Sequence, residues 1–166
     1  MRFIFALIAA STLAVSPALA EDAGFYVGAG IGDFGIDVGG FDGSDTGFKL
    51  LGGYQFIKYF AVEGEYIDGG TVEDSGLEVD VSGWNLSGVG ILPISGTFSL
   101  FAKLGMIFWD AESNGIGDDS GEDFSWGVGG SYAITDQFGA RLEYQGFEIE
   151  DADTVDMISL GATWKF

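Results

Sequence analysis

Eight segments of the chain alternate between large apolar residues and small or polar residues at every second position. A period of two is the pattern of a β-strand with two different faces. The final segment, Ser159–Phe166 (SLGATWKF), shows it clearly. Each segment is long enough for a tilted membrane strand, which needs about 9–11 residues. We place the strands at 24–33, 46–56, 59–69, 79–92, 97–109, 123–134, 137–148 and 155–166.

The connections between these segments alternate in length, and the alternation predicts the topology. Short turns at one end and longer loops at the other describe an all-β, eight-stranded antiparallel up-and-down barrel. Both chain ends would lie on the side of the short turns, and closure would leave no unpaired strand edge. The tight turns are Ile57–Lys58, Pro93–Gly96 and Thr135–Asp136, and the longer loops are Phe34–Asp45, Gly70–Glu78, Asp110–Glu122 and Ile149–Thr154.

The two faces of the strands indicate which side of the barrel meets hydrocarbon. In segment 97–109, Leu100 and Leu104 share one face, whereas Lys103 and Gly105 share the other. The interior of an eight-stranded barrel is narrow, so the small and charged face suits the inside and the bulky apolar face suits lipid. We therefore predict a transmembrane β-barrel. A soluble ligand-binding barrel of the lipocalin kind would need the opposite arrangement, and it is the main alternative.

The balance of charges supports the same orientation. The chain has 26 Asp and Glu against 6 Lys and Arg, which argues against nucleic-acid binding. Most of the acidic residues fall in the longer loops and the adjoining strand ends. A charge that is shielded from water needs a partner, so we predict ion pairs inside the barrel. The charged residues on the inward face are Lys49, Lys103, Arg141, Glu63, Glu65 and Glu143.

The N-terminal stretch MRFIFALIAASTLAVSPALA has the features of a secretory signal peptide. An early Arg2 is followed by an apolar run and by an A-x-A sequence that ends at Ala20. We therefore expect a signal peptide at 1–20 and a barrel domain at 21–166, secreted across the inner membrane.

Motifs for catalysis and metal binding are weak in this chain. It contains no His and no Cys, which excludes imidazole and thiol chemistry. The stretch Gly28–Asp33 (GAGIGD) lacks the third glycine and the helix of a phosphate loop. The acidic stretches Asp42–Gly47 and Asn114–Asp123 lack the spacing of a twelve-residue calcium loop, although weak association of divalent cations remains an alternative. We predict no enzymatic activity, no cofactor, and no catalytic or metal site.

Three motifs, in order, resemble the transmembrane domain of the outer-membrane protein A family. They are GGYQFIKYFAVEGEY, FAKLGMIFWDAES and SYAITDQFGARLEYQ…MISLGATWKF. The resemblance implies a monomeric barrel in the outer membrane of a Gram-negative bacterium, with no peptidoglycan-binding domain expected here. It also implies that Glu63, Lys103, Arg141 and Glu143 form an interior charge network. Val89 stands where one member of the family has an interior Lys, and this difference argues against a gate that depends on a switchable Lys.

The end of the chain also resembles the assembly signal of outer-membrane barrels, at Ser159, Gly161, Trp164 and Phe166. Such a strand can pair with the barrel-assembly machinery by strand addition. Outer-membrane lipid and lipopolysaccharide are the other expected partners. We expect a structural or surface role, with a plugged interior and acidic extracellular loops. A narrow porin-like channel for ions or small solutes is the alternative function.

Overall fold

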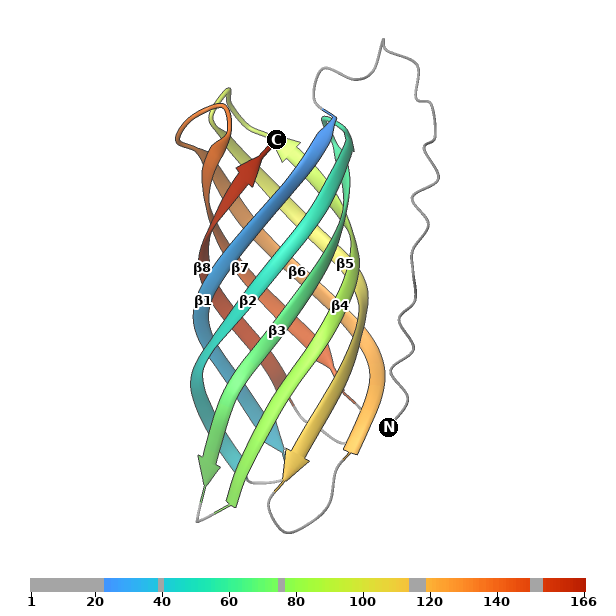
Figure 1. Cartoon of the computed structure of the whole chain (residues 1–166), viewed down its shortest axis with the longest axis vertical. Helices are drawn as coiled ribbons and strands as arrows, with labels where there is room; N and C mark the ends of the chain where they lie inside the picture. The colour runs from blue at the N-terminus through green and yellow to red at the C-terminus, as the bar shows by residue number, and fades with distance from the viewer. Residues whose placement is uncertain (1–22, 39–40, 75–76, 114–118, 150–153) are drawn as a thin grey trace.

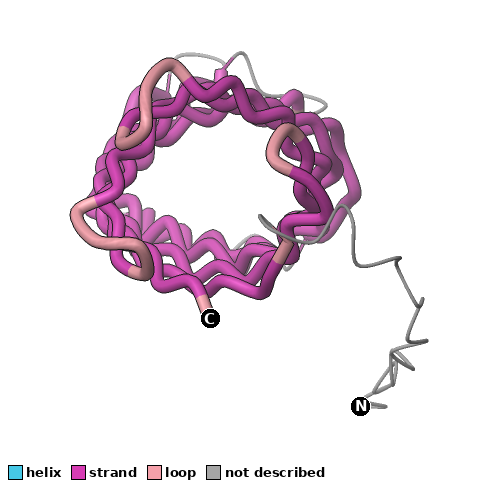
Figure 2. Tube along the Cα trace, turned by 90° about the horizontal axis from the view of Figure 1, so that it is seen from above, coloured by secondary structure: helices cyan, strands magenta, loops and turns pink. Residues whose placement is uncertain are grey.

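The computed structural model describes residues 23–38, 41–74, 77–113, 119–149 and 154–166, and the predicted signal peptide lies outside them. Within these ranges the chain forms eight antiparallel strands, each paired with its neighbours in sequence. Strand β1 also pairs with β8, so the sheet closes into a barrel (Figures 1 and 2). The predicted fold is confirmed. The strands are β1 (Gly24–Val38), β2 (Phe41–Ile57), β3 (Phe60–Asp74), β4 (Leu77–Pro93), β5 (Phe98–Ser113), β6 (Asp119–Ala133), β7 (Phe138–Glu148) and β8 (Thr154–Lys165).

The strands extend further than predicted at one end of the barrel. Strands β1 and β2 pair as far as Val38 and Phe41, and β4 and β5 pair as far as Val79 and Ser113. Much of the predicted loops 34–45, 70–78 and 110–122 is therefore strand, and that part of the prediction was wrong. The ladder satisfies backbone N–H and C=O groups whatever the side chains are, so glycine-rich and acidic stretches can continue it. We call this end the loop end. Within the described ranges, no helix is long and apolar enough to cross a membrane.

The opposite end, which we call the turn end, carries the short connections, and two of them share one local design. In the β4–β5 turn, Ser95 Oγ accepts a hydrogen bond from the backbone N–H of Phe98 at 3.0 Å. In the β6–β7 turn, Thr135 Oγ1 accepts one from the N–H of Phe138 at 2.9 Å. Hydroxyl side chains commonly stabilise turns in this way. A Ser or Thr three residues before a Phe therefore sets both reversals.

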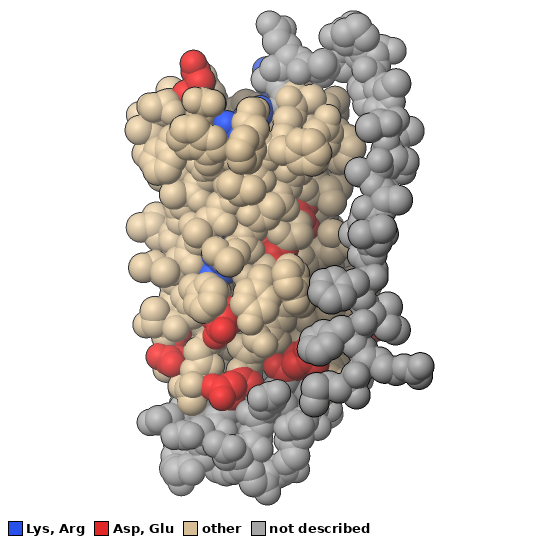
Figure 3. All heavy atoms as spheres, viewed as in Figure 1, with Lys and Arg blue, Asp and Glu red and all other residues tan. Residues whose placement is uncertain are grey.

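The outer face of the barrel is apolar over its middle. Leu104 is 63% exposed, and many other large apolar side chains on this face are also exposed. Two rows of aromatic rings flank the middle: Phe48, Tyr66 and Trp84 toward the loop end, and Phe25, Tyr54 and Phe56 toward the turn end. Figure 3 shows a surface that is mostly tan across the middle, with most of the acidic side chains toward the loop end. An apolar band between aromatic girdles is typical of a membrane barrel.

The interior of the barrel has three layers, which follow one another along the strands. On β5 the inward side chains run from Phe101 through Lys103 to Ile107, and on β3 from Ala61 through two carboxylates to Ile67. The middle layer is the charge network described below. The turn-end apolar cluster consists of Ala61, Val89 and Phe101. The loop-end apolar cluster consists of Phe34, Ile67, Ile107, Phe147, Val155 and Met157. Charged side chains thus occupy the middle of the interior, and apolar clusters lie on both sides of it.

Several inward glycines lie where the narrow interior leaves no room for a side chain. A Cβ at Gly129 would overlap the carbonyl oxygen of Leu142 and the ring of Phe101. A Cβ at Gly105 would overlap the carbonyl oxygen of Leu86, so Gly105 is not a tolerant interior position. By contrast, a Cβ on the outward Gly52 would meet nothing within 4 Å. The narrow interior therefore requires glycine at Gly105 and Gly129, whereas Gly52 on the outer face has room for a side chain.

We expect Gly129→Val to lower the free energy of unfolding by about 1–3 kcal/mol, as is typical of overpacking. Gly52→Val is the matched control and should change it little. Both values would come from urea unfolding of the refolded protein in lipid vesicles, followed by tryptophan fluorescence. Equal costs at the two positions would contradict the tight interior.

Candidate functional site

The candidate site is a cluster of ionised side chains in the middle of the barrel. Strand alternation directs Glu63 and Glu65 inward from β3, and Arg141 and Glu143 inward from β7. Lys49 on β2 and Lys103 on β5 complete the set. Each of the six residues is at most 7% exposed. We call these residues, which carry three positive and three negative charges, the central charge network.

Arg141 and Glu63 form the most directional pair of the network. The guanidinium donates from Nη1 to Glu63 Oε1 at 2.7 Å and from Nη2 to Oε2 at 3.0 Å. Its Nε donates to Glu143 Oε2 at 2.9 Å. The hydroxyl of Tyr26 donates to Glu63 Oε1 at 2.6 Å, and the guanidinium carbon lies 4.0 Å from the centroid of the Phe101 ring. Such forked, charge-assisted hydrogen bonds fix orientation as well as charge.

The two lysines connect the remaining carboxylates. Lys103 Nζ lies 2.6 Å from Glu65 Oε1, 2.5 Å from Glu143 Oε1 and 3.7 Å from Glu63 Oε2. Lys49 Nζ lies 3.0 Å from Glu143 Oε1. Lys103 therefore contacts all three carboxylates of the network.

Neutral side chains supply further hydrogen bonds to Glu65. Its Oε2 accepts from Asn85 Nδ2 at 2.9 Å and from Gln145 Nε2 at 2.8 Å. Ser125 donates in turn to Asn85 Oδ1 at 2.6 Å, and Lys49 donates to Gln145 Oε1 at 2.9 Å. These amides and the hydroxyl were not identified as part of the network from sequence. The sequence feature that could have identified them is that they occupy inward-facing positions on β4, β6 and β7.

The structure brings Glu63, Lys103, Arg141 and Glu143 into direct contact, together with Lys49 and Glu65. Val89 is 2% exposed and lies in the turn-end apolar cluster. Among the described residues, no group of acidic side chains is arranged to hold a metal ion. The acidic stretch 114–123 lies partly outside the described residues.

The residues of the predicted assembly signal lie on both faces of β8. Ser159 and Gly161 face inward and pair with Gly32 and Gly30 of β1. Trp164 is exposed on the outer face, and the ring of Phe166 is 74% exposed. The backbone N–H of Phe166 donates to the carbonyl oxygen of Phe25 at 3.0 Å. The residues therefore lie at the seam where the last strand meets the first.

A closed antiparallel barrel with an apolar outer band, aromatic girdles and a charged interior defines an outer-membrane β-barrel protein. The chain belongs to the outer membrane protein beta-barrel domain family, whose model matches residues 5–166. This match and the relatives below confirm the predicted resemblance.

Among its relatives, the chain is 30% identical over 175 residues to outer membrane protein A of Escherichia coli O157:H7, covering 92% of this chain and 50% of that protein. It is 30% identical over 167 residues to outer membrane protein A of Klebsiella pneumoniae, covering 88% and 47%. The chain thus spans about half the length of the curated relatives it matches.

Solved structures share the fold at lower sequence identity. Neisserial surface protein A superposes with a TM-score of 0.74 at 15% identity, covering 86% of this chain and 97% of that chain. Ail, the attachment invasion locus protein of Yersinia pestis, superposes with a TM-score of 0.65 at 21% identity, covering 86% and 99%. At these identities the likeness establishes the barrel architecture alone.

Proposed function

We propose that the protein is a structural and surface component of the outer membrane, closed inside by its own side chains and without enzymatic activity. The observation that carries the proposal is the central charge network, whose ion pairs join strands on different sides of the lumen. Ion pairs between β3, β5 and β7 cross the space that a pore would need. The cavities beside Lys49 and within the loop-end apolar cluster measure only about 10 Å³ each.

The loop end supports a surface role with an acidic character. Asp33, Asp37, Asp110, Glu122 and Glu148 are exposed there. Lys58 and Lys165, by contrast, lie at the turn end, beside the β2–β3 turn and at the end of β8. We propose that the acidic end faces the exterior.

Ail, which has a similar fold, offers a contrast in ligand binding. That protein was solved in complex with the heparin analogue sucrose octasulfate, which is a polyanion. An acidic loop end would repel such a ligand electrostatically. We therefore do not extend polyanion binding to this chain.

The remaining features of the proposal concern biogenesis and surroundings. We propose that residues 1–20 direct secretion and are removed, leaving 21–166 as a monomeric barrel. The partners would be outer-membrane lipid, lipopolysaccharide and the barrel-assembly machinery. The apolar band supports contact with lipid, and the seam position of Ser159, Gly161, Trp164 and Phe166 supports contact with the assembly machinery during closure.

A narrow channel for ions or small solutes is the second candidate function. A polar hollow of about 450 Å³ at the turn end favours it, because a channel needs a hydrated mouth. The hollow is lined in part by Gln55, Lys58, Ser95 and Ser99. The central charge network lies deeper in the barrel and would have to part for conduction.

Two measurements test the proposal. Membrane fractionation should recover the protein in the outer membrane, with a mobility on SDS gels that changes on heating. Planar-bilayer recording of the folded protein should give no steady current. Large and steady currents from the unmodified protein would replace the structural role with the channel.

Phe166→Ser is expected to lower the yield of folded barrel several-fold in cells, because the last strand loses the terminal aromatic ring of the assembly signal. Phe138→Ser is the matched control, since that ring is also exposed at the turn end but lies outside the signal. The measurement is the fraction of outer-membrane protein whose gel mobility shifts on heating. Equal yields for the two variants would count against the assembly signal.

A further inference from the structure

The central charge network lies between two apolar layers of the lumen. Along β4, the inward side chains change from Val81 at the loop end, through Asn85 and Ser87, to Val89 at the turn end. The same order of apolar, polar and apolar side chains occurs on β3 and β5. On these three neighbouring strands, apolar side chains therefore lie on both sides of the charged middle.

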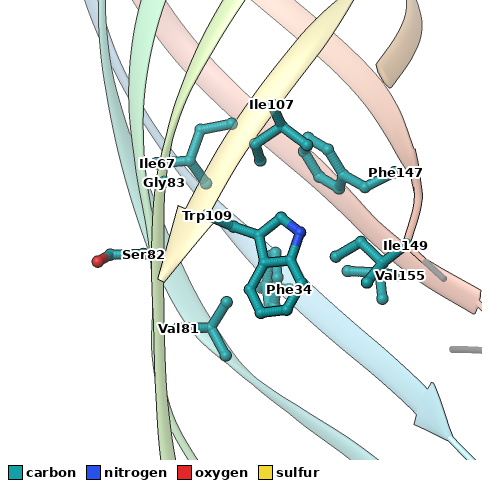
Figure 4. Close-up of a pocket in the computed structure, with 10 residues that line it drawn as sticks. All are labelled: Phe34, Ile67, Val81, Ser82, Gly83, Ile107, Trp109, Phe147, Ile149 and Val155. Carbon is teal, nitrogen blue, oxygen red and sulfur yellow. The ribbon is translucent and has the colours of Figure 1, made fainter. Parts of the chain in front are cut away.

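The loop-end apolar cluster packs closely around a small cavity. Figure 4 shows side chains from several strands converging around the indole of Trp109, while the Ser82 hydroxyl points away. Trp109 Nε1 donates to Asp123 Oδ2 at 2.7 Å, which holds the indole in place. The remaining cavity is about 10 Å³. A buried water needs roughly 10–15 Å³ and two to four polar partners. This cavity barely reaches that volume, and its lining lacks the polar groups that would bind the water.

The turn-end apolar cluster closes the other side. Ala61 and Val89 are at most 2% exposed, and Phe101 is 7% exposed. Tyr26 and Ile91 pack against them. The Phe101 ring also packs against the guanidinium of Arg141, with 4.0 Å between the ring centroid and the guanidinium carbon. This layer separates the network from the polar hollow at the turn end.

We propose that these two apolar clusters, rather than the ion pairs, are the barrier to water and ions, and that they act in series as hydrophobic seals. Apolar constrictions exclude water, and an ion that crosses them loses its hydration without gaining partners. The network between the seals is then a dry structural brace. This inference rests on the proposed closed barrel and adds that breaking one ion pair does not open a path.

The sequence has no Cys, so a single introduced thiol can report access to the network from water. Ser87 is 3% exposed, lies between the two seals, and has a hydroxyl without a hydrogen-bond partner among the described residues. Ser87→Cys therefore removes no observed hydrogen bond. Ser99→Cys is the control, because Ser99 lines the polar hollow outside the turn-end seal.

The experiment measures the rate at which a small water-soluble methanethiosulfonate labels each folded variant in lipid vesicles. Ser87→Cys should react at least about 100-fold more slowly than Ser99→Cys, because the reagent must wait for a local opening. Adding Glu63→Gln, which removes a charge from the network, should leave Ser87→Cys protected. Adding Phe101→Ala, which truncates the largest side chain of the turn-end seal, should make it reactive.

Rapid labelling of Ser87→Cys, either alone or with Glu63→Gln, would overturn the seals, and so would continued protection after Phe101→Ala. If Ser87→Cys fails to fold, Ser125→Cys provides the same test from β6, because Ser125 is 1% exposed and also lies at the level of the network. Planar-bilayer recording separates this inference from the proposed function. A silent wild-type barrel with a rapidly labelled Ser87→Cys overturns only the seals, whereas a wild-type barrel that conducts steadily overturns the closed barrel itself.

Discussion

Glu63→Ala is expected to lower the free energy of unfolding by about 3–5 kcal/mol, the usual cost of removing one partner from a buried ion pair. Arg141 would lose both hydrogen bonds of its fork, and the Tyr26 hydroxyl would lose its acceptor. Lys103 would keep its contacts with Glu65 and Glu143. The interior would carry one uncompensated positive charge. Urea unfolding of the refolded protein in vesicles measures the loss.

Two further variants make this result specific. Asp136→Ala removes a carboxylate that is exposed in the β6–β7 turn, and it should change stability little. Combining Glu63→Ala with Arg141→Met should cost less than the two single changes added together, because the remaining interior charges balance again. A cost for Glu63→Ala as small as that for Asp136→Ala would show that the network does not stabilise the barrel.

Leu104→Arg should destabilise the inserted barrel by about 2–4 kcal/mol if the residue faces the middle of the bilayer. Leu104 is 63% exposed on the outer face and pairs across the ladders with Gly88 and Trp126. Leu100 lies on the same face of β5, two outward positions closer to the turn end. Leu100→Arg should therefore cost about 0–1 kcal/mol, as is usual near the membrane interface.

Both arginine variants would be measured by equilibrium unfolding in vesicles and by the fraction that inserts. The depth dependence is the informative quantity. If both substitutions were nearly neutral, the outer face would lie in water, as in a soluble barrel. If both cost the same large amount, Leu100 would lie as deep in the bilayer as Leu104.

The fold could be predicted from sequence because membrane barrels repeat one rule along every strand. The alternation of side chains along a strand is enough to place Leu104 outside and Lys103 inside. The same alternation directs Glu63, Arg141 and Glu143 inward. The partner of each charge could not be read in the same way. The Arg141 fork on Glu63 joins β7 to β3, and such contacts depend on the tilt and stagger of the closed barrel rather than on spacing in the chain.

The extent of the strands and the loop-end apolar cluster were not predictable from composition. The stretch that contains Phe34 is rich in Gly and Asp, which is typical of a loop, yet it pairs on both sides within the barrel. Val155 is the first residue of one predicted strand, and Phe147 lies near the end of another. At the end of a strand, the alternation of inward and outward residues is too short to show that these two side chains pack inside. The tightness around Gly105 also depends on backbone approach, which sequence alone does not report.

The equal number of positive and negative charges in the central charge network has a consequence for how this chain can evolve. Loss of any one member leaves the interior with an unpaired charge, and a Lys at Val89 would add a fourth cation without a fourth carboxylate. A lineage can therefore alter the network most easily by exchanging two opposite charges together or by passing through a neutral amide. The six residues therefore act as one unit, although they are spread along the chain from Lys49 to Glu143.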